Sequence, residues 1–271
     1  TTEIYTLSLH DALPISYGSY KFPFRKWSVD LIRKAALAYA RDEKTAKEVG
    51  DFVKVTSDMA FGLPYDKAAY SFDAKKKFGI NVSSLLWDDN TRGRFGLSID
   101  YKAFYRSLIT YLIETGEYQV HIIPHVIDNK NYEAAENDYR VCCELEKEFK
   151  GHVILAPAFE TAIQAKSYIS NMDVFLGSRM HSTIGAISSG VATIPLSYAY
   201  KFEALYSHIN YPYVINARKA TTEEALKMTK QWASERDKLK ETGEIAVSHA
   251  LDELVDFKND LKISLKNNDI L

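Results

Sequence analysis

Short apolar runs alternate with longer amphipathic runs along the chain from residue 78 onward. An apolar run of four to eight residues is typical of a buried strand, and apolar residues three or four positions apart are typical of a helix. We therefore expect strands at 79–87, 118–124, 152–157, 173–177, 192–198 and 213–216. We expect helices at 100–115, 133–150, 161–171, 181–189 and 222–265. Because crossovers between parallel strands are right-handed almost without exception, this alternation predicts an α/β fold with a doubly wound parallel sheet.

The pattern before residue 78 predicts only about one and a half α/β units. Helices are expected at 28–37 and 43–49, and strands at 38–40 and 52–56. This is too little sheet for an independent domain. We interpret the chain as three consecutive parts, namely 17–66 as the remnant of an N-terminal α/β domain, 67–77 as a linker, and 78–271 as a C-terminal Rossmann-like domain that ends in a long helical region.

The first sixteen residues differ in character from the rest. The segment TTEIYTLSLHDALPI, residues 1–15, resembles the translation of a sequencing adapter. We expect natural coding to begin at about residue 16 or 17, and we exclude residues 1–16 from reasoning about the fold, as one excludes an expression scar. This segment is expected not to pack as part of the fold, because chain ends are poorly ordered unless they are tied down.

The composition is that of an ordinary globular chain, with 46% hydrophobic and 26% charged residues and a formal net charge of −2. This neutral balance gives no support for nucleic-acid binding. No apolar run approaches the roughly 20 residues that a membrane span needs. Cys142 and Cys143 are adjacent, which indicates a reducing compartment, and no His or Cys lies at zinc-like spacing, so no metal site is predicted.

Candidate chemistry is concentrated in residues 173–201, DVFLGSRMHSTIGAISSGVATIPLSYAYK. Arg179, His181 and Ser182 follow one expected strand, and Lys201 follows the next. The carboxyl ends of parallel strands meet at one edge of the sheet, where such folds bind ligands. A helix that begins near His181 would also present free N–H groups and a positive dipole end there. The stretch therefore predicts an anion site with an imidazole beside it.

The segment SRMHSTIGAISSGVATIPLSYAYKFEAL resembles the signature of the polysaccharide pyruvyltransferase family. Four further segments are similar to the family: ARDEKTAKEV at 40–49, SDMAFGLP at 57–64, INVSSLLW at 80–87 and IIPHVIDNKNYEAAENDY at 122–139. The resemblance covers most of residues 17–213. It implies a GT-B-like fold, here truncated at the N-terminus, and transfer of a pyruvyl group from phosphoenolpyruvate to a sugar as a ketal, with no metal or redox cofactor.

Phosphoenolpyruvate carries a carboxylate and a phosphate, so its pocket needs fixed cations. The planar fork of arginine binds such groups bidentately, which suits Arg179 and Arg41. Lys201 suits a point charge on the leaving phosphate. N–H groups near Ser182 would stabilise the anion, and we expect His125, which follows a strand and a proline, to line the cleft.

Ketal formation also requires proton transfer at the enol and at a sugar hydroxyl. A histidine with a pKa near neutrality suits either task. We predict His181 as the catalytic residue, and the resemblance places the same role on it. By contrast, Asp58 is expected to form an Asx turn and Asn137 and Asp138 to cap or turn the chain.

The implied partners are phosphoenolpyruvate and a saccharide acceptor, which is either free or linked to a lipid. The expected location is the cytoplasm, or the inner face of the membrane if the acceptor is linked to a lipid. Two alternatives stay open. One is a GT-B glycosyltransferase that uses a nucleotide sugar, and the other is an inactive fragment with an anion-binding domain.

Overall fold

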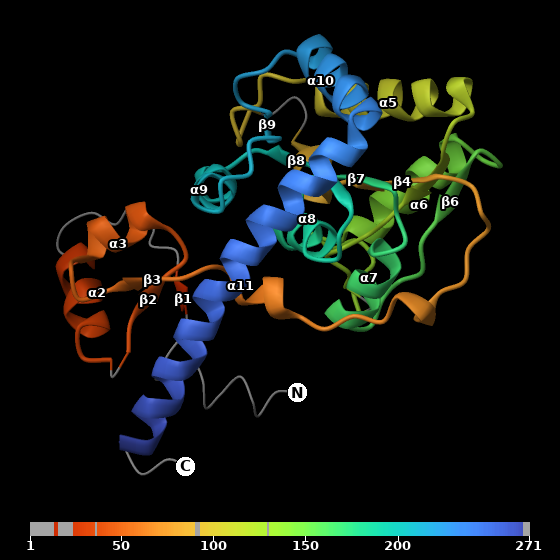
Figure 1. Ribbon diagram of the computed structural model, residues 1–271. Helices are drawn as coiled ribbons and strands as arrows, with labels where there is room; N and C mark the ends of the chain where they lie inside the picture. Colours follow the sequence, from red (N-terminus) through yellow and green to blue (C-terminus); the bar gives the residue numbers. More distant parts are fainter. Residues whose placement is uncertain (1–13, 16–23, 36, 90–92, 129, 268–271) are drawn as a thin grey trace. The chain divides into compact units, whose positions relative to one another are not determined.

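Six parallel strands form the larger of two sheets in the computed structural model (Figure 1). Along the sheet the order is β6-β5-β4-β7-β8-β9. These strands are β4 (Lys77–Asn81), β5 (Gln119–Ile122), β6 (Val153–Leu155), β7 (Val174–Gly177), β8 (Ala192–Ser197) and β9 (Ile215–Asn216). The chain runs outward from β4 to β6 and then returns to the other side of β4 for β7 to β9. The order therefore reverses between β4 and β7, the place where open α/β sheets bind ligands.

Helices connect these strands and confirm the predicted doubly wound α/β fold. They are α4 (Ser84–Asp88), α5 (Tyr101–Thr115), α6 (Asp138–Glu148), α7 (Ala162–Ile169), α8 (Met180–Ile187), α9 (Tyr200–His208) and α10 (Thr222–Ser234). Helices α7 and α8 pack against each other, as do α5 and α10 (Figure 1). One core cluster joins Phe175 of β7 to Ala165 and Ile169 of α7 and to Ala186 of α8. Each crossover thus buries one apolar helix face.

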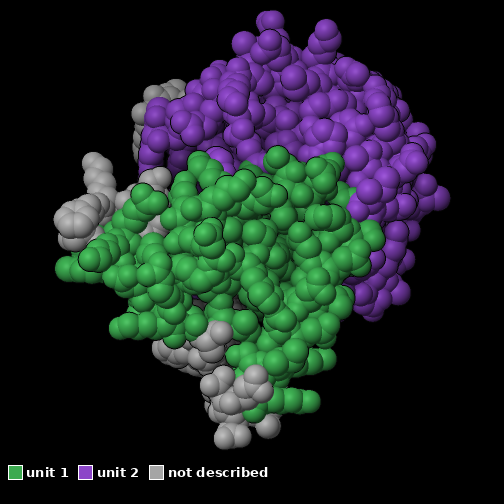
Figure 2. Space-filling view, turned by 60° about the vertical axis from the view of Figure 1, so that its left-hand side comes forward, with its two compact units in different colours: residues 1–62, 204–210, 246–271 green, residues 63–203, 211–245 purple. Residues whose placement is uncertain are grey.

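The structure describes residues 14–15, 24–35, 37–89, 93–128 and 130–267. The chain divides into two compact units (Figure 2). Unit 1 is residues 1–62, 204–210 and 246–271, and unit 2 is residues 63–203 and 211–245.

Unit 1 holds a smaller parallel sheet in the order β1-β2-β3. Its strands are β1 (Pro14–Ile15), β2 (Tyr39–Ala40) and β3 (Lys54–Val55), and its helices include α2 (Phe24–Ile32), α3 (Glu43–Val49) and the 3-10 turn η1 (Met59–Gly62). Buried Ala40, Val49 and Val53 form a small core, against which Val29 and Ile32 of α2 pack.

The prediction that residues 1–16 do not pack as part of the fold is wrong at two positions. Pro14 and Ile15 pair in parallel with Tyr39 and Ala40 of β2. The edge of a sheet presents unpaired N–H and C=O groups, so an extended backbone of almost any sequence can add to it. The other fourteen residues of this segment lie outside the described part of the chain.

The C-terminal helix α11 (Arg236–Asn267) changes the predicted domain boundaries. We expected residues 78–271 to form one domain, but residues 204–210 and 246–271 belong to unit 1. The ring of Phe257 lies edge-on to that of Tyr39, with centroids 5.0 Å apart, and Asp260 binds both Tyr39 and Lys54. Periodicity predicted that this region is helical, but it carries no information about which sheet the helix joins.

Residues 67–77, the expected linker, lie within unit 2, which begins at residue 63. Three side chains of the α7 region hold the segment that includes the 3-10 turn η2 (Lys67–Ala69). Lys166 Nζ donates to the Leu63 carbonyl at 2.7 Å, and Ser167 Oγ accepts from the Asp66 N–H at 2.9 Å. Asn171 Nδ2 donates to the Lys67 carbonyl at 3.1 Å. The polar, aperiodic sequence of this segment therefore belongs to a stretch that hydrogen bonds hold against α7, not to a flexible connection.

Glu253 of α11 fastens this helix to other parts of unit 1. Its carboxylate lies 2.9 Å from His208 Nε2 and accepts a hydrogen bond from Ser57 Oγ at 2.6 Å, while His249 Nδ1 lies 3.9 Å away. The hydrogen bond to Glu253 raises the pKa of His208 despite its burial, and Asp42 and Glu43 act in the same direction. Burial acts to raise the pKa of Glu253, but the hydrogen bonds from His208 and Ser57 outweigh it, and this pKa is lowered.

The His208–Glu253 pair should make unfolding depend on pH. Since the folded pKa of His208 is raised, its contribution is fully present below about pH 6.5, the unfolded value, and is lost as pH rises through the raised pKa. The contribution of Glu253 is lost as pH falls through its lowered pKa. The difference in free energy of unfolding between wild type and His208→Gln, measured by urea titration, should therefore shrink toward alkaline pH. His249→Gln is the control, and an equal difference at every pH would contradict the assignment.

Candidate functional site

The residues predicted to carry chemistry lie at the reversal point of the large sheet. Arg179 and His181 follow β7, and Ser83 and Ser84 follow β4, its neighbour. Asn81, the last residue of β4, lies opposite Gly177 of β7. The carboxyl ends of two adjacent parallel strands thus place these side chains at one edge.

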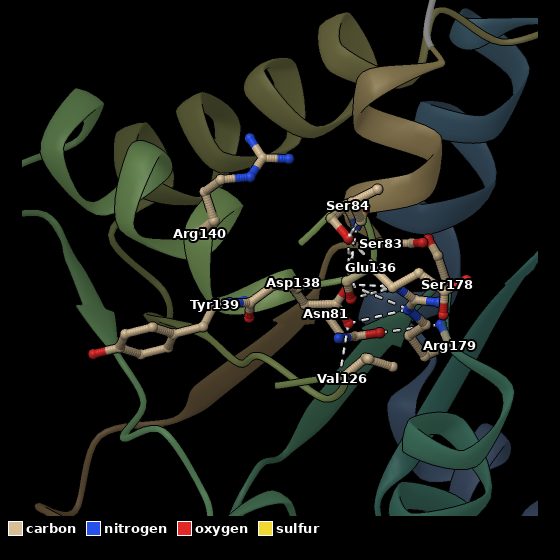
Figure 3. A network of polar contacts seen from close by, with 12 residues as sticks. Asn81, Ser83, Ser84, Val126, Glu136, Asp138, Tyr139, Arg140, Ser178 and Arg179 are labelled. Carbon is tan, nitrogen blue, oxygen red and sulfur yellow. Dashed lines mark hydrogen bonds and ion pairs between the residues drawn. The ribbon is translucent and has the colours of Figure 1, made fainter. Parts of the chain in front are cut away.

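Arg179 is held inside the protein by Asp138, the first residue of α6 (Figure 3). Its Nη2 donates to Asp138 Oδ1 at 2.7 Å, and its Nε donates to Oδ2 at 3.1 Å. Nη2 also donates to the Glu136 carbonyl at 3.2 Å. Only Nη1 makes no hydrogen bond to the described residues. The bidentate edge of the fork, which we predicted would grip the substrate, is thus occupied by a carboxylate of the protein.

Asp138 is fully buried and also organises the backbone around it (Figure 3). Its carboxylate accepts hydrogen bonds from the N–H groups of Ser84 at 2.9 Å and Val126 at 3.0 Å. Asp138 therefore ties the loops that follow β4 and β5 to Arg179 after β7. The predicted capping role is confirmed for Asn137, whose side chain accepts from the Tyr139 N–H. We missed the role of Asp138, because it lies 41 residues from Arg179 and no local pattern links the two.

Asn81 fixes the turn between β7 and α8. Its Nδ2 donates to the Ile123 carbonyl at 3.0 Å, and its Oδ1 accepts from the Arg179 N–H at 3.0 Å. Ser182 Oγ lies 3.0 Å from the same Oδ1 and 2.7 Å from the Arg179 carbonyl. Ser182 is fully buried. We predicted that Ser182 binds substrate, but the partners of its hydroxyl are protein groups, and this geometry gives it a positioning role.

Two tyrosines of α5 form hydrogen bonds with the turn that follows β7. Tyr101 and Tyr105 place their hydroxyls 2.8 and 2.6 Å from Ser178 Oγ, and Tyr101 also accepts from the Ser83 N–H at 2.9 Å. Burial raises the pKa of both phenols, so they remain protonated donors. The hydroxyl of Ser83 is buried and has no partner among the described residues.

His181 and His125 provide the imidazoles of the site. His181 is the second residue of α8 and is exposed, whereas the residues that follow it in the helix are buried. His125 follows β5, and its Nδ1 is buried without a hydrogen-bond partner in the described residues. Burial lowers the pKa of His125 to about 4, while Asp138 acts to raise it and His181 and Arg179 act to lower it. His125 is therefore neutral near pH 7, with a polar nitrogen available.

The N-terminus of α8 differs from those of five other helices. Side chains cap the starts of α3, α5, α6, α7 and α10, namely Asp42, Asp100, Asn137, Thr161 and Thr221. Arg179 occupies the cap position of α8 and makes no side-chain cap hydrogen bond. The first N–H groups of a helix have no partner within it. Together with the helix dipole, they favour an anion at this point.

The other two predicted cations, Lys201 and Arg41, lie on different elements from Arg179. Lys201 is the second residue of α9, after β8, and its side chain is exposed and makes no ion pair within the described residues. Arg41 lies in unit 1, where it forms an ion pair with Asp58. Asp58 Oδ1 accepts from the Ala60 N–H at 2.9 Å, which confirms the predicted Asx turn. The groups of unit 2 that meet at the edge are Arg179, Asp138 and the two imidazoles.

No metal centre emerges from the described residues, in which no group of three or more His, Cys, Asp and Glu side chains could hold an ion. Burial raises the pKa of the Cys142 thiol, so this residue is a poor nucleophile. Among the helices that the structure describes, none has the length and apolar character needed to cross a bilayer.

Solved structures with a similar fold include two α,α-trehalose-phosphate synthases of Burkholderia. That of Burkholderia vietnamiensis is 11% identical with a TM-score of 0.59, covering 98% of this chain and 71% of its own. That of Burkholderia multivorans is 10% identical with a TM-score of 0.56, covering 90% and 62%. TarM of S. aureus is 12% identical with a TM-score of 0.55, covering 94% and 48%. The fold is therefore GT-B-like, and this chain spans less than two thirds of the second and third of these proteins.

A comparison of whole sequences found no matching curated protein. The family model of polysaccharide pyruvyl transferase, by contrast, matches residues 12–200, more than half of the chain. The match includes the strand ends that supply Asn81, His125, Asp138, Arg179 and His181. The chain belongs to the polysaccharide pyruvyl transferase family.

Proposed function

We propose that this protein transfers the pyruvyl group of phosphoenolpyruvate to two hydroxyls of a saccharide and forms a pyruvate ketal. One hydroxyl oxygen bonds to the enol carbon, and the neighbouring methylene carbon gains a proton and becomes a methyl group. Phosphate leaves the enol carbon, and the second hydroxyl oxygen takes its place. Of the two hydroxyl protons, one is balanced by the methyl group and the other by the released phosphate. Neither a redox step nor a metal is needed for this balance.

The donor's anionic groups would lie at the N-terminus of α8. This end carries the helix dipole and lacks a side-chain cap. Arg179 would contribute its free Nη1, so its contact with the donor is a single hydrogen bond rather than the bidentate grip that we first predicted. Lys201, on the edge after β8, would add a mobile positive charge for the leaving phosphate. The neutralised Arg179–Asp138 pair makes the helix end the main fixed attraction for the anion.

His181 would carry the proton. It is exposed on the first turn of α8, so it lies beside the anion site while its neighbours in the helix are buried. An imidazole there can give a proton to the methylene carbon or remove one from the attacking hydroxyl. This exposure at the start of the helix is the observation that carries the proposal. His125, neutral near pH 7, would accept or donate a hydrogen bond through Nδ1 without carrying charge.

Donor binding can be tested by thermal unfolding, because a ligand that binds only the folded state stabilises it. At a concentration 100 times the Kd the gain is about 2.7 kcal/mol. Phosphoenolpyruvate should raise the unfolding midpoint, and inorganic phosphate should raise it less because it lacks the carboxylate. UDP is the comparison ligand. A rise with UDP and none with phosphoenolpyruvate would instead support a glycosyltransferase that uses a nucleotide sugar.

The acceptor proposed here is a saccharide of an exported or cell-wall polysaccharide, carried by a lipid while the ketal forms. Such an acceptor would be met on the cytoplasmic side of the inner membrane. This part of the proposal follows from the family description, which names a polysaccharide. Phosphate release from phosphoenolpyruvate that depends on added saccharide would support it, and release without any saccharide would oppose it.

A further inference from the structure

Helix α2 has two apolar faces, of which the fold uses only one. Val29 and Ile32 pack on the core of unit 1 with Ala40, Val49 and Val53. A surface helix needs one apolar stripe to join its domain. Three large side chains, at spacings of three and four residues, form a second stripe: Phe24, Trp27 and Leu31.

This second stripe is open to solvent. Phe24 is 61% exposed, Trp27 63% and Leu31 71%. The rings of Phe24 and Trp27 contact each other edge-on at 5.8 Å. Single exposed apolar residues are normal on protein surfaces, but a row of adjacent aromatic and aliphatic side chains indicates an interaction surface.

The charges around the stripe favour an anionic partner. Residues 24–34 contain four basic side chains, Arg25, Lys26, Arg33 and Lys34, and one acidic side chain, Asp30. Arg25 donates to the Glu48 carbonyl, and Arg33 lies over the Phe52 ring and 4.0 Å from Asp30. Lys26 and Lys34 are exposed and form no ion pair with any residue that the structure describes.

We propose that α2 is an interfacial helix that docks on the surface of an anionic lipid bilayer. Phe24, Trp27 and Leu31 enter the boundary between headgroups and acyl chains, and Lys26 and Lys34 meet the lipid phosphates. A basic helix with Trp, Phe and Leu on its exposed face is the arrangement that lies in this boundary. The indole of Trp27, which has an apolar body and a polar N–H, favours this depth. The proposal does not depend on the reaction that the protein catalyses.

Flotation with vesicles tests this directly on the complete chain. Vesicles of phosphatidylcholine mixed with an equal amount of phosphatidylglycerol should carry the protein upward, and vesicles of phosphatidylcholine alone should carry much less. Trp27→Ser together with Leu31→Ser should lower the partition coefficient at least about tenfold. The matched control is Ile245→Ser together with Ile263→Ser, which changes exposed side chains of α11 that are 69% and 58% accessible.

The charge component has its own control. Lys26→Glu together with Lys34→Glu should lower binding at least about tenfold, because each lysine near such a surface contributes appreciably, and added salt should weaken wild-type binding. Lys227→Glu with Lys240→Glu, on exposed positions of α10 and α11, should have little effect. Equal binding by wild type and by the Trp27/Leu31 variant would overturn the proposal. So would a change from dimer to monomer in that variant without any vesicle binding, since the stripe would then face a second copy of the chain.

Discussion

His181→Ala should reduce ketal formation by about 10²- to 10⁴-fold, the usual contribution of a general acid or base. Binding of phosphoenolpyruvate should change little, because the helix end and Arg179 hold the anion while His181 moves the proton. Phosphate release with a saccharide acceptor measures the rate, and the ligand-induced rise in the unfolding midpoint measures binding.

His152→Ala is the matched control for this change. His152 is an exposed histidine in the same unit, away from the helix end, and its loss should leave both measurements unchanged. If the His181 variant turned over at a near-native rate, proton transfer would belong to another group. The site would then be an anion site with an unassigned purpose.

Asp138→Ala should destabilise the protein by about 3–5 kcal/mol, the cost of removing one partner of a buried ion pair. The change leaves the guanidinium of Arg179 inside the protein without its carboxylate and also frees the N–H groups of Ser84 and Val126. Urea unfolding measures the effect. The comparison is Glu148→Ala, which breaks the surface pair with Arg106, where both side chains are well exposed. That change should cost no more than about 1 kcal/mol.

A double-mutant cycle would show whether the cost belongs to the pair. If Arg179 is already replaced by Met, removal of the Asp138 carboxylate should cost much less, because no buried charge is left unpaired. Two equal and additive losses would show that Asp138 acts through the loops alone. An Asp138 variant as stable as the Glu148 variant would contradict the structural role given to this carboxylate.

Sequence periodicity located all six strands of the large sheet. The strand expected at 79–87 ends at Asn81, however, Ser84–Asp88 form helix α4, and helix α9 was not predicted. The apolar run before Gly177 and the helical spacing after His181 predicted a strand and a helix where β7 and α8 occur, because burial in a parallel sheet leaves a local trace in the sequence. The helical character of residues 222–265 was also predicted, although the chain breaks at Glu235 into α10 and α11. The sequence did not show which unit α11 joins, because its contacts with Tyr39 link residues that are up to 221 positions apart.

The candidate site shows the same limit. Motif and resemblance pointed to Arg179 and His181, but they did not reveal that Arg179 is bound by Asp138. A sequence pattern shows which residue types occur. It does not show which of their hydrogen-bond donors and acceptors are already paired within the protein. Ser182 is the clearest case, since its place at a helix start predicted ligand contact and its burial beside Asn81 gives it a supporting role. The unpaired nitrogen of His125 could be recognised only once the surroundings of the ring were known.

The return of α11 to unit 1 has a consequence for the order of events during synthesis. Tyr39 and Lys54 are synthesised well before their partners Phe257 and Asp260, since Asp260 follows them by 221 and 206 positions. Almost all of unit 2 lies between these residues along the chain, so it can fold while unit 1 still lacks the part of α11 that belongs to it. Unit 1 cannot be completed until α11 has been synthesised. A nascent chain that stalls before residue 246 would therefore carry an exposed apolar surface around Tyr39, the kind of surface that chaperones bind.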